Sequence, residues 1–300
     1  MRLGLGAVLV LLLLVAAVTG VHWYGARRWA AGSRGLRARL TAARCAIRPE
    51  RVDLAELAGL PAPVQRYFCQ VLSPGQPMLA AARIEHRGDF NLAVGGERWR
   101  PFRSVQHLVT RRPGFVWDAR VALLPGVDVR VNDAYLAGEG VLQAALLGLA
   151  TVMRMPSTPQ LAEGELFRFL AEALWYPTAL LPSQGILWEA VDERSAKATL
   201  ADGAVLVSLV FSFDDRGLID RVHAEGRGYA AKGQVLPMPW ECRLWDYQTQ
   251  DGMLIPMAGE VAWRLPQGLA PYWRGRITRI DYEYAGPDRA VACRLGEEDQ

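Results

Sequence analysis

The sequence predicts a mainly β protein of the α+β class, with a single curved antiparallel sheet of about eleven strands that forms a half-open barrel. Helices are expected on the concave face of the sheet, and one transmembrane helix is expected before it. Three observations support this prediction. An uncharged apolar run lies near the N-terminus, period-two alternation dominates from residue 80 onward, and short turns rich in Gly and Asp separate the alternating segments.

The apolar run covers residues 3–24, which carry no charge. A helix over this run would be about 30 Å long, which matches the hydrocarbon core of a bilayer. Trp23 and Tyr24 end the run, as aromatic residues do at the lipid–water interface. A cleaved signal peptide, the alternative, has a shorter apolar region and a small-residue cleavage site, whereas this run ends in Gly20-Val21-His22. We therefore expect residues 1–26 to be an uncleaved single-pass anchor.

Residues 27–50 are a basic connector, since residues 1–48 hold eight of the 34 basic residues and no acidic one. The positive-inside rule places the following domain in the cytoplasm. Alternatively, the connector lies along anionic headgroups, with Trp29, Leu36 and Leu40 dipping into the interface. Arg outnumbers Lys by 32 to 2, a coding bias of GC-rich bacteria. We expect a bacterial cytoplasmic membrane, with its lipids as partners.

The chain beyond the connector is acidic. Its 26 basic residues face 31 acidic ones, a net charge of −5. Nucleic acids bind basic surfaces, so the charge excludes nucleic acid as a partner. The four cysteines and four histidines show no spacing typical of a metal site or a disulfide framework. We expect no metal and no cofactor, and the redox state of the cysteines and the oligomeric state stay open.

Two helical segments precede the strands. Asp53 to Leu57 is a short helical turn, and residues 60–72 form an amphipathic helix with Pro63 near its first position, where a missing N–H costs nothing. The apolar side chains at helical spacing, expected to lie on a core, are Val64, Tyr67, Phe68, Val71 and Leu72.

The strand segments alternate apolar and polar side chains and are bounded by turn residues. Four of them precede the middle of the chain, at residues 83–92, 104–110, 115–121 and 127–131. Seven follow it, at residues 187–191, 196–200, 205–213, 218–225, 240–247, 254–263 and 272–284. Because no composition break divides them, residues 51–286 are expected to form one β-rich soluble domain, followed by a charged, disordered tail at 287–300.

The middle of the chain is predicted to be helical. Residues 140–153 are apolar on nearly all sides, and a helix of that kind must be buried or cover an apolar surface. A second helix is expected from Leu161 to Trp175, and its apolar side carries Leu166, Phe169, Leu170 and Leu174. Together these helices would cover the concave face of the sheet.

Two sets of residues resemble known families. Val205 to Asp214, followed by an Asp-Tyr, turn, Asp-Gly-x-x-Ile-Pro run in residues 245–256, resembles the half-open barrels of the bacterial lipoprotein carriers LolA and LolB. This resemblance implies an extracytoplasmic domain, which opposes the arginine distribution, so the side of the membrane stays open. The second set resembles the signatures of an uncharacterised bacterial family of membrane-anchored proteins, over residues 55–284. It comprises residues 60–67, 114–120, 175–184 and 272–276.

Signatures of common enzymes are absent from the sequence, including GxSxG, HExxH and Walker sequences. A buried carboxyl has a raised pKa and can act as a general acid, which makes Asp118 or Glu172 a candidate for acid–base catalysis. The competing interpretation pairs each carboxylate with an arginine, as Glu172 with Arg168 at helical spacing. The carboxylates that lie beside aromatic or apolar residues are Asp118, Asp133, Glu139 and Glu172.

The favoured hypothesis is a membrane-anchored binding module that performs no catalysis. It would hold an apolar or amphiphilic ligand, such as a lipid or acyl chain, between the sheet and a helical lid. The candidate ligand-binding residues are Trp117, Tyr135, Leu142, Leu146, Leu170, Trp175, Tyr176, Trp245 and Trp263. The alternatives are a structural or interaction protein of the membrane surface, whose aromatic residues simply fill a core, and an acid–base enzyme.

Overall fold

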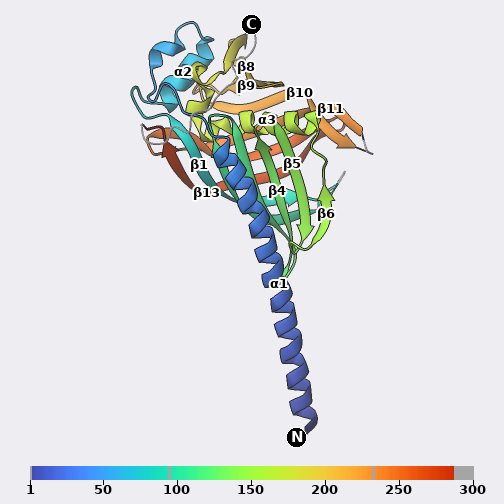
Figure 1. Cartoon of the computed structure of the whole chain (residues 1–300). Coiled ribbons are helices and arrows are strands. Elements are labelled where there is room, and N and C mark those ends of the chain that lie inside the picture. The colour runs from blue at the N-terminus through green and yellow to red at the C-terminus, as the bar shows by residue number, and fades with distance from the viewer. Residues whose placement is uncertain (1, 94–95, 232–233, 287–300) are drawn as a thin grey trace.

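The structure, a computed structural model, describes residues 2–93, 96–231 and 234–286. Its strands form one 13-stranded sheet in the order β6-β5-β4-β3-β2-β1-β13-β12-β11-β10-β9-β8-β7 (Figure 1). The first half comprises β1 (Leu79–Asn91), β2 (Trp99–Val109), β3 (Gly114–Leu124), β4 (Val127–Leu136), β5 (Glu139–Leu146) and β6 (Ala150–Arg154). The second half comprises β7 (Leu187–Asp192), β8 (Ser195–Asp202), β9 (Val205–Phe213), β10 (Ile219–Ala231), β11 (Gln234–Gln250), β12 (Met253–Leu265) and β13 (Gly268–Tyr284).

The helices lie before the sheet and between its two halves. The α-helices are α1 (Arg2–Ala42), α2 (Ala62–Val71) and α3 (Pro159–Glu172). Short 3-10 turns are η1 (Leu54–Leu57), η2 (Ala173–Trp175), η3 (Pro177–Leu180) and η4 (Pro182–Gln184).

The sheet is a chain of hairpins, which confirms the predicted antiparallel class. Every pair of neighbouring strands is consecutive in the sequence except β1 and β13, whose pairing joins the two halves. The β11–β12 turn shows the local chemistry: Asp251 and Gly252 both have positive φ, 47° and 80°, as a tight hairpin turn requires. The edge strands β6 and β7 do not pair with each other, so the barrel stays half open.

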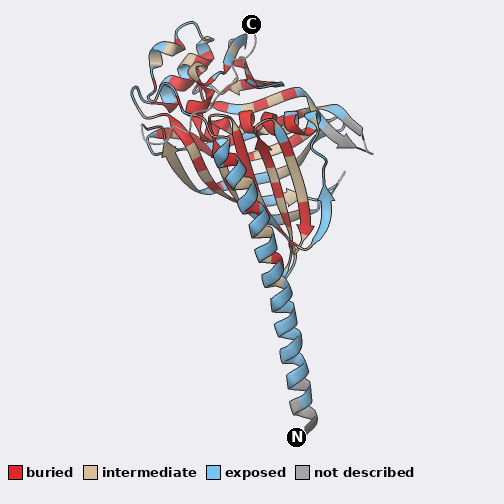
Figure 2. Ribbon diagram, in the orientation of Figure 1, coloured by how far each residue is buried: buried red, intermediate tan, exposed pale blue. Residues whose placement is uncertain are grey.

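Helix α3 lies on the concave face, as the sequence predicts, and contacts β4 and β5 on one side and β9 and β10 on the other. The Thr158 side chain accepts a hydrogen bond from Leu161 N, which caps the helix, and Pro159 occupies its first turn. Its own residues Leu166 and Leu170 are fully buried between the helix and the sheet (Figure 2). The helix therefore bridges two parts of the sheet that lie far apart in the sequence.

The helix expected at residues 140–153 was wrong: this segment forms β5, a tight turn and β6, which accounts for two strands more than expected. Leu147 and Gly148 both have positive φ, so the chain reverses there. Ala144 faces the cavity described below while its neighbour Ala145 faces the opposite side, and both are buried. A strand covered on both faces is apolar without alternation, and that pattern is indistinguishable from a buried helix.

Helix α1 continues without a break into the segment expected to be a separate connector and ends there at Ala42. It is long and apolar enough to cross a membrane from Val8 onward, and its N-terminal half is exposed. The C-terminal half packs on the convex face of β2, β3 and β4, where Leu40 forms a cluster with apolar side chains of the sheet. The residues in that cluster are Leu40, Val109, Val116, Ala134 and Leu136.

The expectation that Trp29, Leu36 and Leu40 enter a membrane interface was therefore wrong. Trp29 Nε1 donates to Asp118 Oδ1 at 3.2 Å, and Leu36 and Leu40 pack on the sheet. Spacing explains the outcome, because Gly25, Trp29, Ser33, Leu36 and Leu40 share one face of a helix. The tail predicted at 287–300 lies outside the described residues.

Candidate functional site

A cavity of about 560 Å³ lies between the concave face of the sheet and α3. Its walls come from both halves of the sheet, from β6 and from the inner face of α3. The apolar lining includes Phe90, Val121, Val131, Leu142, Ala144, Met153, Leu244 and Val261. The aromatic lining includes Trp117, Trp175, Trp240, Trp263, Tyr272 and Trp273. The cavity is therefore mostly apolar, with a polar group that α3 supplies.

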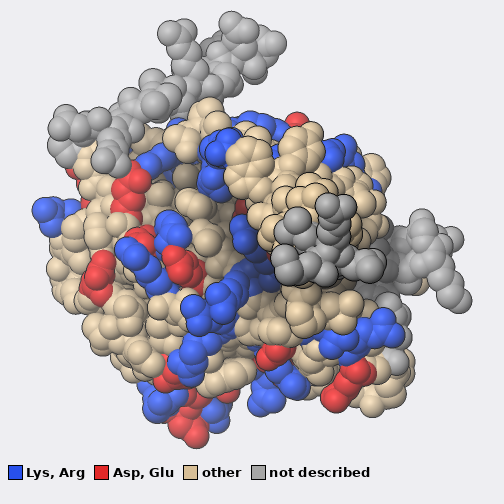
Figure 3. Space-filling model, turned by 90° about the horizontal axis from the view of Figure 1, so that it is seen from below, with Lys and Arg blue, Asp and Glu red and all other residues tan. Residues whose placement is uncertain are grey.

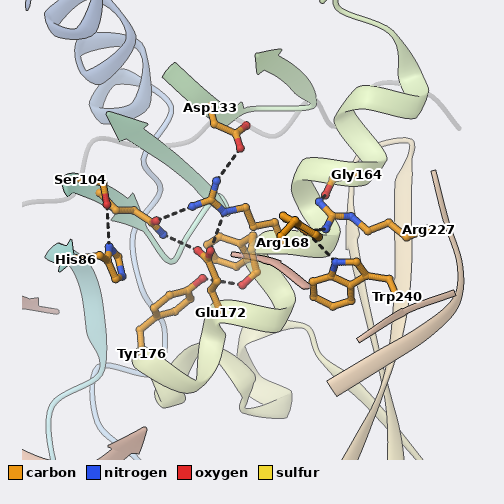
Figure 4. Close-up of polar contacts among 12 residues, drawn as sticks. His86, Ser104, Asp133, Gly164, Arg168, Glu172, Tyr176, Arg227 and Trp240 are labelled. Atoms are coloured by element: carbon orange, nitrogen blue, oxygen red, sulfur yellow. Dashed lines mark hydrogen bonds and ion pairs between the residues drawn. The ribbon is translucent and has the colours of Figure 1, made fainter. Parts of the chain in front are cut away.

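Arg168 of α3 is the centre of that polar group (Figure 4). Its Nη1 lies 2.6 Å from Asp133 Oδ2 on β4, and its Nε lies 2.7 Å from Glu172 Oε1, one helical turn further along α3. The guanidinium also lies 4.9 Å from the ring centroids of Phe115 and Trp117. Two ion pairs and two aromatic faces hold this charge in place.

Gln106 of β2 completes the cluster. Its side-chain amide donates to Glu172 Oε2 at 2.7 Å, and its oxygen accepts from Arg168 Nη2 at 3.2 Å. Because Gln106 is fully buried, both ends of its amide need partners, and the cluster supplies them. The arrangement ties α3 to β2 and β4 through side chains that lie far apart in the sequence.

Glu165 of α3 faces Asp133 and is 4% exposed. Burial raises the pKa of Glu165 well above its usual value, and the neighbouring Asp133 charge raises it further. Neither Glu165 Oε2 nor Asp133 Oδ1 has an N–H or hydroxyl donor among the described residues, while the two carboxyl groups contact each other. A proton on Glu165, donated to Asp133, satisfies both groups and removes one negative charge from the cavity.

Arg227 of β10 lies in a second polar group at the cavity wall. It donates to Tyr272 Oη at 3.2 Å and to the backbone oxygen of Gly164 at 3.0 Å, and it lies 4.9 Å from the ring centroid of Trp240. Trp240 Nε1 also donates to Tyr272 Oη, at 2.9 Å. Neutral groups and aromatic rings therefore position this guanidinium (Figure 4).

Two indole N–H groups in the lining have no acceptor among the described residues. They belong to Trp117 and Trp175, both buried. Both nitrogen atoms are themselves inaccessible to solvent, so they do not open onto the cavity. The polar side chains that line it include Arg168, Glu165 and Arg227.

Four of the nine residues predicted to bind ligand line the cavity: Trp117, Leu142, Trp175 and Trp263. Tyr135, Leu170 and Tyr176 are instead fully buried in the core. The Tyr135 hydroxyl donates to Asp202 Oδ2 at 2.8 Å and the Tyr176 hydroxyl to Phe169 O at 2.6 Å, so neither reaches the cavity. These three side chains pack in the core outside the cavity lining.

The last two predicted residues also lie outside the lining. Trp245 is 47% exposed and points away from the cavity, because its neighbour Leu244 faces inward. Leu146 lies at the end of β5, beside the turn that contacts α1. The same alternation puts Asp118 on the convex face, away from the cavity, while Glu172 is held by Arg168 and Gln106.

Sequence reasoning missed Glu165, Gln106 and Arg227 as site residues. The Arg168–Glu172 pair could be found from its helical spacing, and it is present. Glu165 lies three residues before Arg168 on the inner face of α3, so helical spacing in the sequence could also have identified it. Gln106 and Arg227 come from distant strands and reach the site only because the sheet is curved. No group of three or more His, Cys, Asp or Glu side chains suited to a metal ion occurs within the described part of the chain.

The chain is similar to one protein family and to several solved structures. Residues 58–282 match the model of a "Family of unknown function (DUF6920)". The fold is similar to that of a LolA superfamily protein from Nitrosomonas europaea, with a TM-score of 0.40 and 10% identity over 75% of this chain and 94% of that one. The fold is also similar to that of a putative outer membrane lipoprotein-sorting protein domain from Vibrio parahaemolyticus, with a TM-score of 0.38 and 12% identity over 70% of this chain and 88% of that one.

A third similar structure, a beta-barrel-like protein with a domain of unknown function from Brucella abortus, has a TM-score of 0.26 and 11% identity over 69% of this chain and 99% of that one. No curated protein matches the sequence. The family match confirms the resemblance to an uncharacterised family predicted from the sequence.

Proposed function

Since the chain belongs to DUF6920, a family of unknown function, we propose its function from its own geometry. It is a membrane-anchored binding module that holds an apolar or amphiphilic ligand, such as a lipid or an acyl chain, in the cavity between the sheet and α3. The proposal includes no catalytic step.

The cavity is the observation that carries this proposal. Protein cores are close-packed and hold few voids larger than a water molecule. A volume of about 560 Å³ falls instead within the range of small-molecule sites, which are mostly apolar with a few placed polar groups. The competing hypothesis, a structural protein whose side chains fill the interior, does not account for this volume.

Helix α1 supports a position of the cavity next to a bilayer. Its exposed apolar surface runs to Tyr24, and the next residue, Gly25, already touches the β5–β6 turn at Leu147. If residues 3–24 span the membrane, this turn lies at the level of the headgroups. Figure 3 views the domain from the side on which α1 projects from it. Lys and Arg side chains gather there beside the helix, and their positive charge suits anionic headgroups.

The edge strand β6 gives the ligand a route. Val152 and Met153 are 58% and 41% exposed, yet both line the cavity, so one side of its lining reaches the surface. Because β6 follows the turn that touches Gly25, this opening lies on the membrane side of the domain. We infer that a ligand passes between bilayer and cavity beside β6.

A cavity-filling variant tests the function. Ala144 is buried and lines the cavity, so Ala144→Trp should occupy the volume, while Ala190→Trp places the same side chain on the exposed strand β7. We expect the full chain and Ala190→Trp to bind a solvatochromic acyl probe, and Ala144→Trp to lose most of that binding while still unfolding cooperatively. Equal binding by all three proteins, or by none, would overturn the proposal.

A further inference from the structure

Two arginines line the cavity, and their partners differ. Arg168 is in ion pairs with Asp133 and Glu172. Arg227 forms no ion pair with a carboxylate of the described residues, and its two hydrogen bonds go to the neutral Tyr272 hydroxyl and the Gly164 carbonyl. A guanidinium has five N–H donors, so about three donors of Arg227 remain for another partner.

The surroundings of Arg227 raise the cost of leaving that charge without a counter-ion. It is partly exposed and lies against the rings of Trp240 and Trp263, at 4.9 Å and 5.9 Å, in a mostly apolar wall that also carries Glu165. A charge that is partly removed from water is stabilised by an anionic partner. The rings and the Gly164 carbonyl fix the plane of the guanidinium, which pre-organises it for a planar or tetrahedral anion.

We propose that Arg227 binds the anionic headgroup of the ligand, so that the occupant of the cavity is a single-chain or lipid amphiphile with a carboxylate or phosphate. This inference rests on the proposed function, because it names the class of ligand for the same cavity. The acyl chain lies along the apolar walls, and the headgroup accepts two parallel hydrogen bonds from the guanidinium.

The carboxyl groups of the cavity have partners other than Arg227: Asp133 and Glu172 are both paired with Arg168, and burial raises the pKa of Glu165, which favours its neutral form.

The test compares three ligands with the same alkyl chain: dodecanoic acid, dodecyl phosphate and dodecanol. Each is titrated against the full-length protein in nanodiscs of zwitterionic lipid, and displacement of an uncharged fluorescent alkyl probe is measured. We expect the wild type to bind the acid or the phosphate at least about tenfold more tightly than the alcohol, as charge-assisted hydrogen bonds require. The tighter of the two anions identifies the headgroup.

Arg227→Met should remove this preference and leave the affinity for dodecanol unchanged, while Arg227→Lys should restore part of it. Arg274→Met is the matched control, because Arg274 also lies over an indole ring, 4.4 Å from Trp99, but is 49% exposed and paired with Glu260. A purely structural role for Arg227 would change the affinity for all three ligands alike. Equal binding of anions and alcohol by the wild type overturns this inference but leaves the proposed function intact, whereas binding of none of them overturns both.

Discussion

The backbone oxygen of Leu147 lies so close to Gly25 that a Cβ atom on Gly25 would stand 2.2 Å from it. Helix α1 and the β5–β6 turn therefore fit together only because residue 25 has no side chain. Three residues on, the Arg28 guanidinium donates to Leu149 O at 3.0 Å and fastens the same turn. The helix that leaves the domain is thus fixed to the strand pair beside the cavity, which ties the orientation of the cavity to that of α1.

Gly25→Ala should weaken this junction. The new methyl group must displace backbone rather than a flexible side chain, so we expect a loss of about 1–3 kcal/mol in the free energy of unfolding. Gly32→Ala is the control, because nothing lies within 4 Å of that position, and it should gain up to about 1 kcal/mol from helix propensity alone. Thermal unfolding of the two variants in the same detergent measures the difference. An equal gain in the free energy of unfolding in both would show that Gly25 is not in tight contact with Leu147.

The β3–β4 turn should lie at the membrane surface. It neighbours the β5–β6 turn, since Leu147 N donates to Asp128 O at 2.9 Å, and its Leu124 is 66% exposed. A fluorophore at position 124 should be quenched by nitroxides on lipid headgroups. One at Leu187, which is 67% exposed on the edge strand β7, should not. Equal quenching at both positions would show that the domain does not rest on the bilayer in this orientation.

Removing Arg168 should destabilise the fold strongly. Arg168→Met leaves Asp133, Glu172 and Gln106 without their shared partner in a buried site, which typically costs about 3–5 kcal/mol. Arg39→Met breaks a comparable contact on the surface, where the two side chains are 51% and 58% exposed, and should cost less than about 1 kcal/mol. Denaturant unfolding of both variants tests the contrast, and similar losses would mean that the buried cluster adds nothing beyond a surface pair.

Stability should fall as pH rises because of Glu165. The folded protein keeps a proton on this carboxyl that the unfolded chain releases near the ordinary pKa of 4.5. Its contribution is therefore complete below that pH and is lost as pH rises through the raised pKa, at up to about 1.4 kcal/mol per pH unit. Glu165→Gln should remove this decline, so that the stability of the variant rises relative to that of the wild type as the pH rises above 4.5.

Glu163→Gln, on the exposed side of the same helix, is the control for that series. It should follow the pH dependence of the wild type. If Glu165→Gln also follows it, Glu165 is ionised in the folded protein and the shared proton with Asp133 does not exist.

Local patterns predicted most of the architecture. Alternation identified eleven of the strands, and the inner face of α3 followed from the spacing of Leu166 and Leu170. The segment 140–153 was misassigned because burial on both faces removes the alternation that distinguishes a strand. A Leu-Gly pair at its centre, where the chain turns, was the signal against a helix.

The site could be predicted only in part, because it is assembled across the sheet. Trp117 was found as one of several tryptophans, and alternation along β3 decided that it, and not Asp118, faces the cavity. Gln106 and Arg227 come from β2 and β10, and the curvature of the sheet brings both side chains within hydrogen-bonding distance of α3. No local spacing in the sequence indicates that Gln106 and Arg227 lie close to α3.

If the cavity holds an amphiphile, native mass spectrometry of the full chain extracted from its membrane should detect the bound molecule. We expect a population whose mass exceeds that of the polypeptide by one lipid or acyl molecule, present in the wild type and in Ala190→Trp but absent from Ala144→Trp. The polypeptide mass alone in all three proteins, or the same adduct in all three, would contradict it.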